Sequence, residues 1–330
     1  MQTSTRGKNI LGLAIFAICI ACFTYNLPLA QGASYPDETI KVIVPAGAGG
    51  GLDREIRGIL PFLKKHLPVP VIIEYMPGAA QRRGHNSLYK SRPDGYTLII
   101  TSLPGSVVGE LMFKPEHKIY ECTPLYAWAS MNNTLYTHVD SWKSFDEFVE
   151  VARSRKIALG LGSGLGGTPH LQGLLLADGL GFDFKWVPFK SAAPALSALV
   201  GKHVEAVICT GKAGRPLVEA GKLRGLVVLG DTPDAALPGV PTRKKLGYKF
   251  AVQPLLRGIL GPPNLPKDRA KILEDALEKA AKDPEFQEWA NKMGLLLVDY
   301  HPKEFAEAID TIYKDVGKIL DRLEKTKKKE

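Results

Sequence analysis

The sequence predicts an α/β protein made of two successive α/β units, and three observations lead to this fold class. Short apolar stretches bounded by Gly and Pro alternate with longer amphipathic stretches, as strands and helices do around a parallel sheet. The alternation restarts near residue 133 and continues to about residue 250. The length of 330 residues is enough for about two domains, each with its own core.

The first unit is predicted to contain strands at residues 39–45, 69–75 and 95–101. Residues 53–67 are predicted to form a helix that Pro61 kinks, because a proline inside a helix removes a backbone hydrogen bond. A further strand at residues 257–263 is predicted to return to this sheet, which makes the unit discontinuous.

The second unit repeats the pattern. Its predicted helices are residues 144–155, 168–180 and 193–201, and its predicted strands are residues 156–162, 184–189 and 204–210. Apolar stripes in the C-terminal part indicate helices that pack on a core, and we assign them no chemistry.

The N-terminal segment has the three-part form of a secretory signal peptide. Arg6 and Lys8 precede an uncharged apolar run at residues 10–23, and small residues follow at Ala30 and Gly32. The run is too short to favour a spanning helix. We therefore expect residues 1–33 to be removed and the mature protein to be exported. An uncleaved anchor, or a lipid on Cys22, is the alternative.

Charge and cysteine content argue against several classes of function. The net charge is +9, but part of it lies in the signal segment and in the solvated tail at residues 325–330, so no nucleic-acid partner is expected. Cys122 and Cys209 remain after cleavage, either as one disulfide or as two buried thiols. None of the seven histidines lies in a metal-binding pattern, so we expect no metal and no cofactor.

The stretch "VIVPAGAGGGLDREIR" runs from a predicted strand through a glycine-rich turn into a helix. Glycines let the backbone approach a ligand, and the free N–H groups of a helix start favour an anion. No Walker A pattern is present, so the loop is not that kind of nucleotide site. The alternative is a turn without a ligand in which Asp53 caps the helix.

A second glycine-rich turn, "GLGSGLGGTPHL", contains a literal GxGxxG followed by Asp183. A dinucleotide fold places its acidic residue at the end of the next strand, whereas Asp183 precedes that strand. Thr168 and Pro169 are typical of an N-cap and a first helical residue. We therefore expect no nicotinamide site.

Ser163 and His170 lie in this second turn and could face one pocket. The outer positions of a GxSxG nucleophile elbow are occupied by Leu161 and Leu165, so a catalytic serine is not supported. Hydrogen bonding to a ligand, or a His170 on the helix surface, explains these residues more simply. Two helix starts facing each other across a cleft would hold a small anion, and we expect a carboxylate.

Seven segments, in order, resemble those of the substrate-binding proteins of tripartite tricarboxylate transporters, also called the Bug family. They are "YPDETIKVIVPAGAGGGLDREIR", "IEYMPGAAQRRG", "RPDGYTLIIT", "GSGLGGTPHL", "VPFKSAAPALSALVGKHVEAVI", "LPGVPTRKKLGY" and "PKEFAEAI". The resemblance implies a two-lobed periplasmic binding protein fold (type II-like), each lobe a mainly parallel sheet flanked by helices. Lobe 1 would comprise residues 34–132 and 251–330, and lobe 2 residues 133–250, with the ligand cleft between them.

The resemblance also implies the ligand-binding residues, with Asp53 shaping its loop and capping the helix and not touching the anion. They are Ala48, Gly50, Gly51, Leu52, Asp53, Thr101, Ser102, Ser163, Gly166, Gly167, Thr168, His170, Phe189, Lys190 and Ser191. Two segments depart from the family pattern. Arg82 and Arg83 replace small or neutral residues, either to add charge for the ligand or as a solvent-facing pair on the rim. Phe189 replaces a tyrosine.

The function implied is that of a receptor and not of an enzyme. It would capture a small organic carboxylate, such as a di- or tricarboxylate or an aromatic acid, and deliver it to a permease of two membrane subunits. We expect a monomer. The alternatives are a periplasmic sensing subunit for a receptor kinase and a secreted hydrolase that uses Ser163 and His170.

Overall fold

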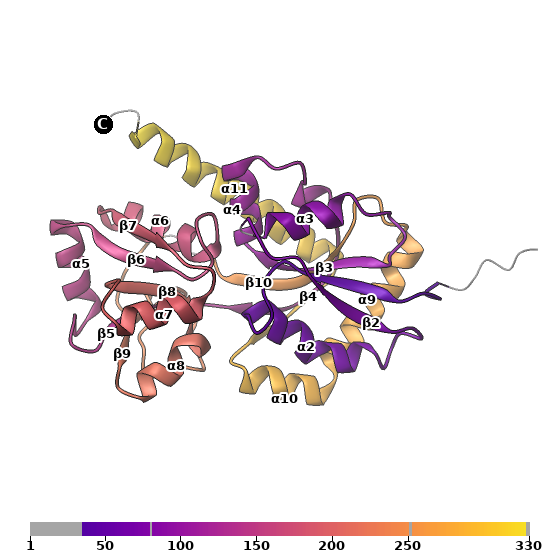
Figure 1. Cartoon of the computed structure of the whole chain (residues 1–330), viewed down its shortest axis with the longest axis horizontal. Coiled ribbons are helices and arrows are strands. Elements are labelled where there is room, and N and C mark those ends of the chain that lie inside the picture. The colour runs from indigo at the N-terminus through magenta and orange to yellow at the C-terminus, as the bar shows by residue number, and fades with distance from the viewer. Residues whose placement is uncertain (1–34, 80, 251–252, 328–330) are drawn as a thin grey trace, which may run out of the picture. The chain divides into compact units, whose positions relative to one another are not determined.

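A computed structural model describes residues 35–79, 81–250 and 253–327 (Figure 1). The predicted signal peptide, residues 1–33, lies outside the described residues, and so does Cys22. The chain divides into the units Met1–Asp37 and Glu38–Glu330, and every helix and strand below belongs to the second of these.

Six strands form the first sheet: β1 (Ile40–Val44), β2 (Val71–Tyr75), β3 (Thr97–Leu103), β4 (Thr123–Met131), β10 (Leu255–Gly261) and β11 (Leu296–Tyr300). Their order is β11-β4-β10-β3-β1-β2. β1 pairs in parallel with β2 and β3, while β10 lies antiparallel between β3 and β4. The predicted return of a late strand to the first sheet is therefore confirmed.

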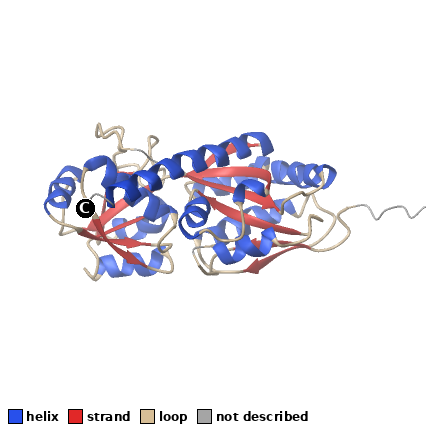
Figure 2. Cartoon of the chain, turned by 90° about the horizontal axis from the view of Figure 1, so that it is seen from above, coloured by secondary structure: helices blue, strands red, loops and turns tan. Residues whose placement is uncertain are grey.

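Helices cover both faces of the first sheet (Figures 1 and 2). They are α2 (Gly51–Leu63), α3 (Arg82–Tyr89), α4 (Gly105–Phe113), α9 (Lys267–Lys282), α10 (Pro284–Lys292) and α11 (Pro302–Lys327), with a 3-10 turn, η1 (Ile119–Glu121), before β4. α2, α9 and α10 pack together on one face, and α3, α4 and α11 pack together on the other.

Five strands form the second sheet, in the order β7-β6-β8-β5-β9. They are β5 (Asn133–His138), β6 (Ile157–Leu161), β7 (Phe184–Pro188), β8 (Ala206–Thr210) and β9 (Leu223–Val228). The helices of this part are α5 (Phe145–Ser154), α6 (Thr168–Leu180), α7 (Ala192–Val200) and α8 (Gly211–Glu219). One core cluster gathers side chains of α5 and α6, and another gathers those of α7 and α8.

The two helix-flanked sheets confirm the predicted fold class, and each sheet is mixed, with one or two strands running against the others. β10 and β11 run antiparallel to their neighbours in the first sheet, and β5 runs antiparallel between β8 and β9 in the second. Apolar runs reveal strands but not their direction, which is decided by the connections. Asn132 alone links β4 to β5 and carries the chain from one sheet to the other.

α6 contributes to the cores of both sheets. Leu176 and Leu180 pack in a cluster with α5, whereas Leu171 and Leu175 pack in a cluster with side chains of α4 and α11. This double packing explains why α6 is buried on most of its surface. It fixes the N-terminus of α6, and the second glycine-rich turn before it, against the first sheet's helices.

Candidate functional site

The glycine-rich turn between β1 and α2 is shaped by Asp53. α2 begins at Gly51 with Gly50 as its N-cap, two residues earlier than predicted, so Asp53 lies in the first turn and does not cap the helix. One carboxylate oxygen of Asp53 accepts a hydrogen bond from Gly49 N at 2.7 Å. Gly49 has φ +77°, a left-handed conformation that glycine adopts without strain.

The carboxylate of Asp53 is also held from the side. Its second oxygen accepts hydrogen bonds from Tyr75 Oη at 2.5 Å and Arg57 Nε at 2.8 Å. Burial opposes ionisation, but the hydrogen bonds from Tyr75, Gly49 and Arg57 outweigh it, so the pKa of Asp53 lies below its usual value. The carboxylate thus keeps its charge and fixes the turn, as the sequence predicts.

His170 shapes the second glycine-rich turn, between β6 and α6. Its Nδ1 accepts a hydrogen bond from Gly166 N at 3.1 Å, and its ring lies edge-on against Trp186 at 4.8 Å between centroids. His170 is buried, so the alternative of a helix-surface histidine is wrong. α6 begins at Thr168, as predicted, but its N-cap is Gly167 and not Thr168, which is the first helical residue.

Ser163 is the one polar side chain of this turn that points to an additional partner. Its Oγ is buried and has no hydrogen-bond partner among the described residues. A buried hydroxyl without a partner is costly, and such groups in native structures usually mark a ligand or water site. A Cβ on Gly167 would lie 2.1 Å from this oxygen, so the turn requires glycine there.

The loop after β7 lies beside the turn before α6. Phe189 N donates a hydrogen bond to Leu161 O at 3.0 Å, and Ala192, in the first turn of α7, closely approaches Gly162. Ser191 is the N-cap residue of α7. Phe189 and Ser191 are half-buried, while the side chain of Lys190 is exposed. The structure therefore brings these two predicted ligand loops together at one edge of the second sheet.

α4 joins the turn before α6 to the first sheet. Gly105 N, at the start of α4, donates a hydrogen bond to Thr168 Oγ1 at 3.1 Å, and Phe113 lies against Gly166. The guanidinium of Arg82 stacks on Phe113, with its carbon 4.0 Å from the ring centroid. Arg82 is thus a packing residue at this junction, whereas Arg83 is exposed.

Thr101 and Ser102 are buried at the end of β3 and belong to a polar network. Thr101 Oγ1 lies 3.3 Å from both Ser106 Oγ and His85 Nε2. Ser102 Oγ accepts a hydrogen bond from Arg257. Both side chains are at most 5% exposed, so they support the neighbouring loops from inside the first sheet.

A cavity lies at the start of α2 and is lined from both sheets. Its lining residues are Gly51, Arg54, Glu55, Met131, Asn132, Thr210, Gly211, Lys212, Pro233, Asp234, Ala235, Arg257, Met293, Gly294, Leu295 and Leu296. The space open to the centre of a water molecule is about 50 Å³, enough for a few waters. Of the predicted ligand residues, only Gly51 lines it.

Five charged residues around the cavity were missed by the sequence analysis: Arg54, Glu55, Lys212, Asp234 and Arg257. Lys212 lies just after the predicted strand at residues 204–210, and this position was the one available signal. Arg257 Nε donates to Glu55 Oε2 at 2.9 Å, with both side chains at most 6% exposed. Burial raises the pKa of Glu55, and the charge of Arg257 opposes this shift.

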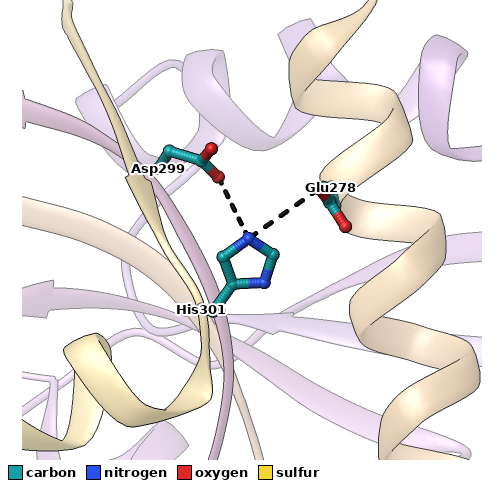
Figure 3. Close-up of side chains that lie close together, drawn as sticks. All are labelled: Glu278, Asp299 and His301. Carbon is teal, nitrogen blue, oxygen red and sulfur yellow. Dashed lines mark ion pairs between the residues drawn. The ribbon is translucent and has the colours of Figure 1, made fainter.

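A histidine and two carboxylates gather between α9 and β11: Glu278, Asp299 and His301 (Figure 3). Nζ of Lys282 lies 2.6 Å from Glu278 Oε1 and 3.1 Å from Asp299 Oδ2. The hydrogen bond from His301 Nδ1 to Glu274, 2.8 Å long, raises the pKa of His301. Because cationic side chains already neutralise these carboxylates, we interpret the cluster as an ion-pair network that holds α9 to β11.

Cys122 and Cys209 are both buried free thiols and do not form a disulfide. Burial is the main cause that raises the pKa of Cys122 to about 12, and it raises the pKa of Cys209 as well. Neither thiol ionises near neutral pH, so both are inert packing residues.

Two buried histidines, His85 beside Thr101 and His117 beside His85, predict acid sensitivity. Burial lowers the pKa of His85 to about 4 and that of His117 to about 3, and the two rings lie 5.5 Å apart. Both folded-state pKa values lie below the usual 6.5, so the stabilisation is complete above pH 6.5 and is lost as the pH falls towards 4. One pKa unit is worth about 1.4 kcal/mol, so the protonation of His85 alone should lower the free energy of unfolding by about 3 kcal/mol.

Urea unfolding from pH 7.5 to 4.5 tests this expectation. His85→Gln should flatten the loss of unfolding free energy below pH 6.5 relative to the wild type, whereas His203→Gln, on an exposed turn, should leave the slope unchanged. Identical slopes for the wild type and His85→Gln would show that His85 does not titrate as described.

The sequence matches the family described as the tripartite tricarboxylate transporter family receptor over residues 56–324. It is 30% identical over 300 residues to the "UPF0065 protein in gbd 5'region" of Cupriavidus necator, which covers 89% of this chain and 90% of that protein. A solved "periplasmic transporter" has a TM-score of 0.79 and 28% identity, covering 88% and 98% of the two chains. MatC of Rhodopseudomonas palustris with bound malate has a TM-score of 0.79 and 25% identity, covering 86% and 99%.

Two helix-flanked mixed sheets with a cavity lined from both define the class: this is a binding protein with the fold of periplasmic binding proteins. More particularly, the chain belongs to the family of tripartite tricarboxylate transporter receptors, and the resemblance seen in the sequence is confirmed. It is a solute receptor and not an enzyme. Within the described part of the chain, no helix is long and apolar enough to cross a membrane.

Proposed function

We propose that the mature protein is an exported receptor that binds a small organic carboxylate between two lobes and delivers it to a membrane permease. The proposed lobes are residues 34–132 with 251–330, and residues 133–250. The observation that carries this proposal is the cavity at the start of α2. Gly51 lines it from the first sheet, and Thr210, Gly211 and Lys212 line it from the second.

The start of α2 supports an anionic ligand. Gly50 offers no side chain to cap the helix, so the first N–H groups and the positive end of the helix dipole are open to a carboxylate. The structurally similar MatC was solved with malate, a dicarboxylate, which agrees with this ligand class.

The predicted ligand residues divide into two groups in this proposal. Gly51, which lines the cavity, its neighbours Ala48 and Gly50, and Ser163, whose Oγ has no hydrogen-bond partner among the described residues, are the proposed ligand contacts. The remaining ones hold the loops. They are Leu52, Asp53, Thr101, Ser102, Gly166, Gly167, Thr168, His170, Phe189 and Ser191, while the exposed Lys190 keeps its predicted role as a ligand contact.

The two other functions receive less support. A hydrolase needs a base hydrogen-bonded to its nucleophile, but His170 Nδ1 accepts from Gly166 N and Ser163 Oγ lacks a hydrogen bond among the described residues. A sensing subunit would use the same ligand site. Transport and sensing differ in the partner, so a permease that binds the ligand-loaded protein favours transport.

A thermal-shift screen tests the ligand class. The protein from residue 34 onward, unfolded and refolded to remove carried-over ligand, is heated with mono-, di- and tricarboxylates, aromatic acids and amino acids. A ligand at a hundredfold excess over its Kd should add about 2.7 kcal/mol of stability, roughly 5 to 10 °C. A folded protein that responds to no carboxylate would contradict the proposal.

A further inference from the structure

The cavity at the start of α2 carries an excess of positive charge. Three cationic side chains line it, Arg54, Lys212 and Arg257, against two acidic ones, Glu55 and Asp234. Such an excess inside a partly enclosed space attracts an anion more strongly than the same charges on an open surface.

Three of these five charges already have partners. Arg257 and Glu55 form the buried ion pair described above. Asp234 accepts a hydrogen bond from Ala236 N at 2.9 Å and another from Gly211 N, at the start of α8. These three groups therefore already have hydrogen-bond or ion-pair partners inside the protein.

Arg54 and Lys212 are different. Neither forms an ion pair with a carboxylate among the described residues. Arg54 is exposed, and among the described residues its Nη1 donates to Gly49 O at 2.8 Å, while Lys212 Nζ lies against the thioether sulfur of Met293. Lys212 is half-buried, so its charge lacks both full hydration and a counter-ion.

The two cations come from different sheets and repel each other. Arg54 lies in the first turn of α2, beside the first sheet, and Lys212 lies in the first turn of α8, beside the second. Burial, followed by the charges of Arg54 and Arg215, lowers the pKa of Lys212. An anion between Arg54 and Lys212 would replace this repulsion by two attractions.

We propose that Arg54 and Lys212 together form a subsite for a second carboxylate of the ligand, so that this receptor selects di- and tricarboxylates over monocarboxylates. This inference rests on the proposed function. The first carboxylate binds the glycine-rich turn of α2, and the second bridges the two cations. Because one cation comes from each sheet, the bridge also stabilises the arrangement in which both sheets contact the ligand.

The test compares Arg54→Gln and Lys212→Gln with two matched controls. Lys64→Gln at the end of α2 and Lys222→Gln in the turn after α8 each remove one positive charge from an exposed position outside the cavity. Titration calorimetry uses malate and citrate as multiply charged probes and butyrate as the singly charged probe.

Each cavity variant should weaken malate or citrate binding by about tenfold or more, the scale of one lost charge-assisted hydrogen bond. The control substitutions should change the affinity for malate or citrate by less than about twofold, because a surface charge screened by solvent has only a small effect on binding. Butyrate binding should be unaffected by all four substitutions. Equal affinities for the diacid in the wild type and both cavity variants would overturn the subsite and leave the proposed function standing.

A second measurement does not depend on the organic ligand. Without ligand, Arg54→Gln and Lys212→Gln should each raise the Tm, because each removes the repulsion, and the double variant should gain less than the sum. Inorganic sulfate should raise the Tm of the wild type more than that of the double variant. If sulfate discriminates but no carboxylate binds, the subsite stands and the proposed ligand class fails. Equal sulfate responses would overturn the subsite.

Discussion

Arg257→Met is expected to lower the free energy of unfolding by about 3–5 kcal/mol, the usual cost of leaving a buried charge without its partner. Arg257 and Glu55 are 5% and 4% exposed, and their ion pair joins β10 to α2. Arg257 also donates to Ser102 at the end of β3. Its loss therefore leaves a buried carboxylate and a buried hydroxyl without a donor. Urea unfolding of the ligand-free protein at pH 7.5 measures the effect.

The double variant Glu55→Met with Arg257→Met is the matched control. Removing both charges leaves apolar side chains in place of the pair, so most of the lost stability should return. Arg224→Met, whose side chain bonds only to backbone carbonyls near the protein surface, should cost much less. If the free energy of unfolding of the single Arg257→Met variant lies within about 1 kcal/mol of the wild-type value, the ion pair is not important for stability.

Gly167→Val is expected to abolish ligand binding and to lower stability by about 1–3 kcal/mol, the usual cost of overpacking. A Cβ at this position would lie 2.1 Å from Ser163 Oγ, 3.1 Å from Ser163 Cβ and 3.2 Å from Ser163 O. Moving the hydroxyl relieves only the first contact, so the turn before α6 must shift. Titration calorimetry with the carboxylate found in the screen measures binding.

Gly239→Val is the control for this substitution, because a Cβ there meets open space and the backbone does not need a left-handed φ. It should bind ligand as the wild type does. A Gly167→Val variant that folds and binds the ligand with unchanged affinity would show that the turn between β6 and α6 is not part of the ligand site.

Sequence patterns located the glycine-rich turns well. The predicted strand at residues 39–45 became β1, the turn after it opens α2 within two residues of the predicted start, and α6 covers the predicted residues 168–180. These elements are recognisable because local periodicity and glycine content specify them. By contrast, no pattern predicted β4 and β5 at residues 123–138, which join the sheets through Asn132.

The cavity could not be predicted for a different reason. Its charged residues come from positions 54, 55, 212, 234 and 257, which are spread along the sequence, and no pattern in the sequence predicts that they meet at one site. What a charged side chain can bind depends on the groups around it, and the order of the strands decides which groups these are. β10, inserted between β3 and β4, is what carries Arg257 to Glu55 and Ser102.

The sequence by itself determined the fold class, the family, the places of both glycine-rich turns and the role of Asp53 in shaping the first of them. Those features depend on residues near one another in the chain. Only the tertiary structure decided that the sheets are mixed, that His170 is buried, that Cys122 and Cys209 stay apart, and that Arg54 and Lys212 share one cavity. Each of these depends on contacts between distant segments, which local patterns do not encode.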